Sequence, residues 1–263
     1  MRTTRPLATG LLLLVLPATA LAAQYDPNLH VDPSVGDCSV RFAPTLTQDA
    51  FRRFVREFGS VSAFKQAAPP PTLGQWHFAV DLQEIDFKVE EHSAAWNDIF
   101  VHPNGSHPLG SDKQFPMLRL RAGVSDDLDV GVFYTANSEA NYGWLGVEAK
   151  YGWLRQSEDM PVSVSVRGAY TKTLYVSDMD MHALTADVSV GRTFWNALTP
   201  YAALGVDAVL ARETSSAVEL HDEAPFVPHL TAGLEARWWH VAVGGEVQVS
   251  ALTSYQMRVS ALF

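Results

Sequence analysis

The feature that most constrains the fold of this chain is an alternation of apolar and polar residues that runs from Gly74 to the last residue, Phe263. The alternation comes in segments of roughly ten residues with turn-like breaks between them. In one segment, apolar side chains occupy every second position from Leu128 to Tyr134, and Asp129 and Gly131 are among the residues between them. Because successive side chains of a strand point to opposite faces, each segment predicts a β-strand with one apolar face.

Ten such segments predict an all-β, antiparallel fold with an even number of strands, within a range of about eight to twelve. In the first segment the apolar residues change phase between Leu82 and Ile85, which predicts a β-bulge there. The segments are 76–89, 118–124, 128–134, 145–151, 162–167, 184–190, 202–208, 230–237, 241–249 and 255–263.

The breaks between the segments fall into two alternating sets. One set contains two long connections rich in His, Asp, Pro and Gly, whereas the other contains only shorter ones. Long connections on one side and short turns on the other are typical of a transmembrane β-barrel, with the long ones outside the cell. The first set is 90–114, 137–141, 173–181, 212–227 and 250–254, and the second is 125–127, 154–161, 194–200 and the break at Trp239.

Residues 1–22 have the pattern of a secretory signal peptide. Two arginines precede a short apolar core from Leu11 to Leu16, and Ala20-Leu21-Ala22 offers a small-residue cleavage site. After Ala23 no apolar run approaches 18 residues, so a membrane-embedded mature chain would have to be a closed barrel. We therefore expect a signal peptide (1–22), a periplasmic N-terminal segment (23–73) and an outer-membrane barrel (74–263).

Composition excludes several classes of protein. With 47% hydrophobic residues the chain is not disordered, and its net charge of −10 argues against a nucleic-acid partner. Removal of residues 1–22 takes away two arginines and no acids, which makes the net charge −12. The single cysteine, Cys38, excludes an internal disulfide and a multi-cysteine metal site.

The polar faces of the predicted strands carry six cationic and six acidic side chains. In a membrane barrel they would face the lumen and could pair there, whereas in a soluble secreted barrel, which remains an alternative, they would face water. Aromatic residues near the strand ends favour the membrane barrel, because girdles lie at both membrane interfaces. The charges are Arg119, Arg121, Asp129, Glu148, Lys150, Arg167, Asp187, Asp207, Glu235, Arg237, Glu246 and Arg258, and the aromatics are Tyr142, Trp144, Trp153, Phe194, Trp195, Tyr201, Trp238, Trp239 and Tyr255.

The N-terminal segment contains one amphipathic helix. Phe51, Phe54, Val55 and Phe58 have helical spacing, and Thr47-Gln48-Asp49 supplies a start and Gly59 a stop. Residues 67–71 form a stiff, proline-rich linker into the barrel. The helix could plug the periplasmic mouth, lie on the inner leaflet, pack on a partner or bury its stripe on its own domain.

The last strand and the first tight hairpin resemble those of bacterial outer-membrane β-barrel proteins. A terminal Phe preceded by apolar residues at every second position looks like the signal recognised by the barrel-assembly machinery; here it is formed by Tyr255, Met257, Val259, Ala261 and Phe263. Residues 120–132, which turn at Ser125-Asp126-Asp127, look like a recurrent hairpin of these proteins. The resemblance implies an outer-membrane location, with membrane lipid and the assembly machinery as partners.

For function, the sequence predicts a non-enzymatic barrel without a cofactor. The lumen charges would form either a salt-bridged structural core or a narrow path for a small-molecule solute. The alternative is an omptin-like surface hydrolase, because the predicted loops carry histidines and carboxylates; no metal-ligand spacing and no GxSxG motif accompanies them. Those residues are His92, His102, His107, His182, His221, Asp98, Asp178, Asp180, Asp222 and Glu223.

Overall fold

The computed structural model describes residues 39–90, 92–101, 112–136 and 141–263. The predicted signal peptide, Cys38, His102 and His107 lie outside these ranges. No helix within them is both long and apolar enough to cross a membrane.

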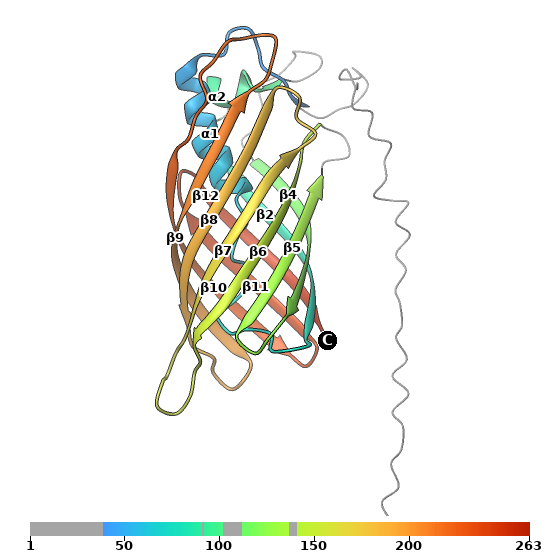
Figure 1. Ribbon diagram of the computed structural model, residues 1–263, viewed down its shortest axis with the longest axis vertical. Helices are drawn as coiled ribbons and strands as arrows, with labels where there is room; N and C mark the ends of the chain where they lie inside the picture. The colour runs from blue at the N-terminus through green and yellow to red at the C-terminus, as the bar shows by residue number, and fades with distance from the viewer. Residues whose placement is uncertain (1–38, 91, 102–111, 137–140) are drawn as a thin grey trace, which may run out of the picture. The chain divides into compact units, whose positions relative to one another are not determined.

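Ten antiparallel strands close into a barrel, which confirms the predicted fold (Figure 1). Each strand pairs with its neighbours along the chain, and β12 pairs with β2 to complete the ring. The strands are β2 (Phe78–Lys88), β4 (Asp112–Gly123), β5 (Leu128–Ala136), β6 (Gly143–Leu154), β7 (Ser163–Leu174), β8 (Met179–Gly191), β9 (Leu198–Glu213), β10 (Phe226–Trp238), β11 (Val241–Val249) and β12 (Thr253–Leu262).

The two ends of the barrel differ in their connections. Residues 124–127, 155–162, 192–197 and 239–240 form what we call the short-turn mouth, and the segments between the other strand pairs form the long-connection mouth. At the long-connection mouth lie α2 (Ala94–Asn97) and a two-stranded sheet of β1 (Ser39–Val40) and β3 (Phe100–Val101). The two longest connections, 89–111 and 214–225, lie at the same mouth as predicted, but the lengths do not alternate throughout, since 155–162 is longer than 175–178, and the small sheet was not predicted.

The predicted bulge in the first strand is wrong. Strand β2 pairs with β4 from Phe78 to Lys88 without a shift, and its residues alternate regularly between outside and inside. Asp81 and Gln83 point inward, and so do Ile85 and Phe87 further along. The apolar residues change phase because the interior changes from polar to apolar along the strand. Among the paired strands the described register shifts only in β6, between Gly152 and Leu154.

The outer face of the barrel is apolar. Leu82, Leu120, Val147, Leu204 and Val243 are representative of the exposed aliphatic side chains that cover the strands. Tryptophans gather at the short-turn mouth, where Trp195 and Trp239 are 83% and 80% exposed. Three residues predicted for the girdles do not belong to them, because Tyr142, Trp144 and Tyr201 are buried.

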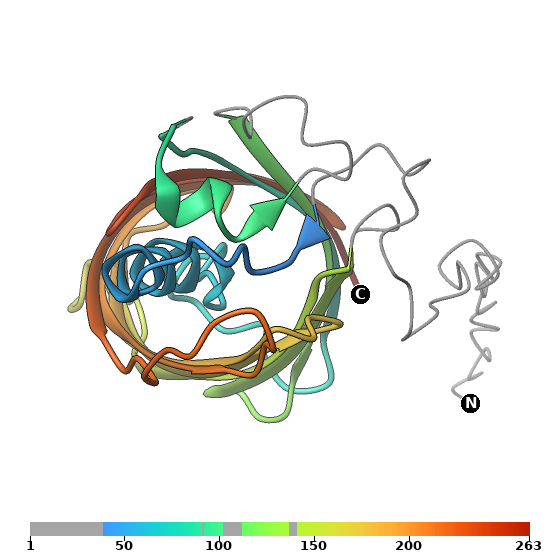
Figure 2. The same cartoon turned by 90° about the horizontal axis from the view of Figure 1, so that it is seen from above.

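Helix α1 (Gln48–Ser62) lies inside the ring of strands (Figure 2). Thr47 caps it by accepting a hydrogen bond from the Ala50 amide, as predicted, but the helix continues past Gly59 to Ser62. Gly59 permits close contact with the wall, because an added Cβ would lie 2.6 Å from Val209 Cγ2. The chain then descends through the barrel to the short-turn mouth (Figure 1). The helix pattern left four locations open, namely the periplasmic mouth, the inner leaflet, a partner or its own domain, and in the structure residues 48–73 lie within the barrel.

Candidate functional site

Residues 48–73, which we call the plug, occupy the lumen in two different environments. The upper half of the lumen, next to the long-connection mouth, is apolar. Phe54 and Phe58 of α1 stack on each other at 4.9 Å and lie against Trp96, Phe100 and Trp144. All of these side chains are buried, so this half resembles the core of a soluble domain. The other lumen residues of the cluster include Phe51, Phe87, Phe115, Phe133, Met179, Met181, Val209 and Val227.

Polar contacts hold the plug and the preceding residues at the long-connection mouth. Asp178 accepts a hydrogen bond from the Phe42 amide at 2.9 Å, and the Asn141 side chain bonds both backbone groups of Val40. On the helix, Arg52 pairs with Glu223 at 3.1 Å and Arg53 with Glu90 at 2.8 Å.

Glu57 ties α1 to both its own turn and the neighbouring helix. Its carboxylate accepts hydrogen bonds from Arg53 at 2.7 Å and from Trp96 Nε1 at 2.6 Å. Hydrogen bonds from Arg53 to Glu57 and Glu90 raise the pKa of its guanidinium, so Arg53 is always a cation.

The lower half of the lumen is polar, and its wall contacts the backbone of the plug. Arg167 donates to the carbonyls of Phe64 and Lys65 at 2.8 and 3.2 Å, and Arg119 donates to that of Gln66 at 3.0 Å. These bonds are charge-assisted, which makes them stronger than neutral ones.

The same pattern continues toward the short-turn mouth. Lys150 donates to the carbonyls of Pro69 and Pro71 at 3.2 and 2.9 Å. In the opposite sense, the Ala67 amide donates to Glu246 at 2.9 Å and the Leu73 amide to Asp129 at 3.0 Å. Cationic and acidic wall side chains therefore form hydrogen bonds with the plug backbone along its whole lower part.

These wall charges also pair with one another. Glu148 bridges Arg119 and Arg167, and Arg167 also pairs with Asp187. Arg121 donates two hydrogen bonds of 2.7 and 2.9 Å to the Asp81 carboxylate. A second arginine, Arg258, lies 3.4 Å from Asp81 and also pairs with Glu235, and Lys150 lies 3.2 Å from Asp129.

Sequence reasoning missed two charges of this network. Asp81 is completely buried in the lumen, and the alternation of residues 76–82 had already placed it on the polar face. Lys65 of the plug is also buried, but its position inside the barrel left no signal in the sequence. Of the predicted lumen charges, the structure buries Arg119, Arg121, Asp129, Glu148, Lys150, Arg167, Asp187, Asp207, Glu246 and Arg258, leaves Glu235 partly buried, and exposes Arg237.

Among the described loop residues of the hydrolase alternative, one His–Asp pair is in contact. His182 lies 3.3 Å from Asp180 and bonds Tyr170, all on the outer side of β7 and β8. Among the described residues no three His, Cys, Asp or Glu side chains are grouped as metal ligands would be. At the C-terminus, Tyr255, Met257, Val259 and Phe263 point outward and Ala261 is half-buried.

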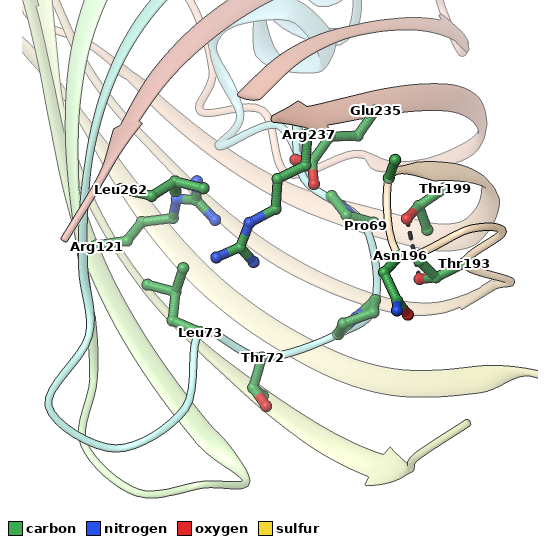
Figure 3. A pocket seen from close by; sticks show the side chains of 12 residues that line it. Pro69, Thr72, Leu73, Arg121, Thr193, Asn196, Thr199, Glu235, Arg237 and Leu262 are labelled. Carbon is green, nitrogen blue, oxygen red and sulfur yellow. Dashed lines mark hydrogen bonds between the residues drawn. The ribbon is translucent and has the colours of Figure 1, made fainter. Parts of the chain in front are cut away.

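Two cavities flank the plug at the short-turn mouth. One of about 260 Å³ lies between the plug and strands β4, β9, β10 and β12 (Figure 3). The other, of about 390 Å³, lies on the side of the β6–β7 turn. Pro71, Thr72, Thr193 and Asn196 line both, so the plug divides one vestibule into two chambers.

The fold is similar to solved outer-membrane barrels, although no protein-family model and no curated protein sequence matches the chain. An outer membrane channel from Pseudomonas putida F1 has 9% identity and a TM-score of 0.48, and the match covers 76% of this chain and 100% of that one. Ail, the attachment invasion locus protein of Yersinia pestis, has 12% identity and a TM-score of 0.34, with 72% and 99% covered. The KdgM porin has 10% identity and a TM-score of 0.36, with 70% and 98% covered.

Proposed function

We propose that this chain is an integral outer-membrane β-barrel whose lumen, polar in its lower half, is a narrow path for a small solute, closed by its own plug. The apolar outer face supports the membrane location, since aliphatic side chains cover strands that have no partner layer. The exposed tryptophans at the short-turn mouth are placed as an interfacial girdle would be.

The observation that carries the proposal is the course of residues 48–73 through the lumen. The wall around their lower part is lined with charges, which an uninterrupted structural core would not need. Withdrawal of the plug would leave those charges facing a water-filled path. The same side chains that now bond the plug backbone would then contact a polar solute.

Burial of the helix keeps the path closed at rest. Phe51, Phe54 and Phe58 are fully buried, and each contributes about 1.5–3 kcal/mol relative to exposure in water. Spontaneous openings should therefore be rare, and we expect them as brief single-channel events between long closed periods.

A reversible lock on the plug tests this function. An ideal Cβ at position 59 lies 3.1 Å from Val209 Cβ, close to the 3.5–4.5 Å of a disulfide, and Val209→Cys removes the crowding methyl groups. In a Cys38→Ser background, Gly59→Cys with Val209→Cys should abolish single-channel openings in planar bilayers when oxidised. Reduction of the same molecules should restore them, which makes the reduced form its own control.

A deletion of residues 39–73, which removes the whole plug, provides the second arm. It should give a barrel that conducts persistently, provided that the unheated band still runs faster on electrophoresis and so reports a closed barrel. A folded deletion variant without conductance would overturn the channel and leave a purely structural barrel. Openings that persist in the oxidised double cysteine variant would show that the path does not run past the plug.

A further inference from the structure

The smaller cavity at the short-turn mouth has an excess of positive charge. Arg121 and Arg237 reach it from β4 and β10, and the Arg237 side chain extends into its middle (Figure 3). Glu235 also lines it, but this carboxylate is bound to Arg258. Arg121, Asp81, Arg258 and Glu235 form a group with no net charge, so Arg237 adds one uncompensated cation.

Both arginines have unused hydrogen-bond donors. Arg121 uses Nε and Nη2 on Asp81, and its Nη1 bonds no described residue. The Arg237 guanidinium has no hydrogen bond or ion pair with any residue in the described ranges, although its backbone amide bonds Ala197 at 2.7 Å. Two planar groups therefore offer N–H donors to one cavity at the short-turn mouth, the arrangement that carboxylates and phosphates match.

The rest of the lining suits a small polar anion with an apolar part. Thr193 and Thr199 bond each other at 3.0 Å, and the Asn196 side chain lies beside them (Figure 3). Leu73, Leu262 and Pro69 cover the remaining walls. A volume of about 260 Å³ admits only a compact ligand.

We propose that this cavity binds a small oxyanion, a phosphate or carboxylate compound, between the guanidinium groups of Arg237 and Arg121. The site goes beyond the proposed channel function and does not depend on it, since the cavity exists with the plug in place. Because Leu73 and Pro69 belong to the plug, a bound anion also contacts the segment that closes the lumen.

Calorimetric titration of the full chain in detergent tests the site with two probes, inorganic phosphate and acetate. Sodium chloride at matched ionic strength controls for screening. We expect saturable binding of at least one probe, and Arg237→Gln should weaken it about tenfold or more. Arg237→Lys keeps the charge but loses the planar fork, so its affinity should lie between those of the unchanged protein and the Arg237→Gln variant.

Arg192→Gln is the matched control, because Arg192 is an exposed arginine at the same mouth that stacks on Phe194 and does not line the cavity. It should leave binding unchanged. Preference for phosphate or for acetate would identify the oxyanion class. Absence of saturable binding of both probes, or equal binding by the Arg237→Gln variant, would overturn the proposal. Equal loss in the Arg192→Gln variant would do the same, since it would show only a general effect of surface charge.

Discussion

In the upper half of the lumen α1 is held by aromatic packing, whereas in the lower half residues 63–73 are held by hydrogen bonds between charged wall side chains and their backbone. Aromatic packing depends on the shapes of the side chains that meet, so the helix needs its phenylalanines at fixed positions. Phe64 packs on Phe133 and lies under Arg119, but a backbone carbonyl is present at every residue, so residues 67–71 need no particular side chains. This accounts for the run of alanines and prolines from Ala67 to Pro71.

Neither force depends strongly on moderate salt, because apolar burial is not electrostatic and buried charged groups are screened much less than exposed ones. One readout can compare the two halves. Ser60 is fully buried in α1, so in a Cys38→Ser background Ser60→Cys should react with an impermeant maleimide only when the plug leaves its seat. The labelling rate then changes about tenfold for each 1.4 kcal/mol of plug stability.

The largest effect is expected in the aromatic half. Phe58→Ala removes a side chain that contacts four aromatic rings, at a cost of about 3–5 kcal/mol. Labelling of Ser60→Cys should rise by about two orders of magnitude or more. Leu204→Ala, on the outer face, is the control and should leave labelling unchanged. An earlier melting of the barrel without faster labelling would mean that Phe58 stabilises the wall and not the plug.

A smaller effect is expected from the charged half. Arg119→Gln loses the bond to the Gln66 carbonyl and the pair with Glu148, but Glu148 keeps Arg167 as a partner. The cost should be about 1.5–3 kcal/mol, and labelling should accelerate between roughly tenfold and a hundredfold.

Arg155→Gln is its control, because Arg155 is half-exposed and pairs with Asp127 outside the lumen. If Arg119→Gln accelerated labelling as much as Phe58→Ala, the two halves would hold the plug equally. Aromatic packing in the upper half would then restrain the plug no more than the hydrogen bonds of the lower half.

The smallest effect is expected at the long-connection mouth. Glu90→Gln breaks its pair with Arg53, in which both side chains are about half exposed, so it should cost only about 0.2–1 kcal/mol. Labelling should rise by no more than about fivefold, and raised salt should reduce the difference from the unchanged protein. Glu158→Gln, in the exposed β6–β7 turn, serves as the control. An effect as large as that of Arg119→Gln would place the main restraint on the plug at the mouth.

The alternation of the sequence predicted the barrel well, because a two-residue period leaves one apolar face wherever a strand crosses the same environment. The prediction failed where the barrel interior changes from polar to apolar along a strand. If apolar residues faced outward throughout, Ile85 and Phe87 would mark a change of phase and Tyr142 and Trp144 would be girdle residues, but all four side chains are buried. These four side chains face the apolar upper half of the lumen.

The candidate site could be predicted only in part. The strand period identified the charges that line the wall, but their counterparts on the plug are mainly backbone carbonyls, which every sequence has. The helix pattern was clear from its Phe residues, yet nothing in it distinguishes burial inside a barrel from burial on a surface. Gly59 permits the close contact of the helix with Val209, but its role can be recognised only once the helix and the wall are known to meet.

The seam between β2 and β12 has a consequence for the order of folding. Strand β12 pairs with β2 from Ser254 opposite Phe87 to Leu262 opposite Ala79, so the ring closes only when the last strand of the barrel is in place. The segment that fills the ring precedes its first strand and is synthesised before any of the wall. The barrel can therefore curl around its own contents and seal last, and insertion of a folded helix through a finished pore is not required.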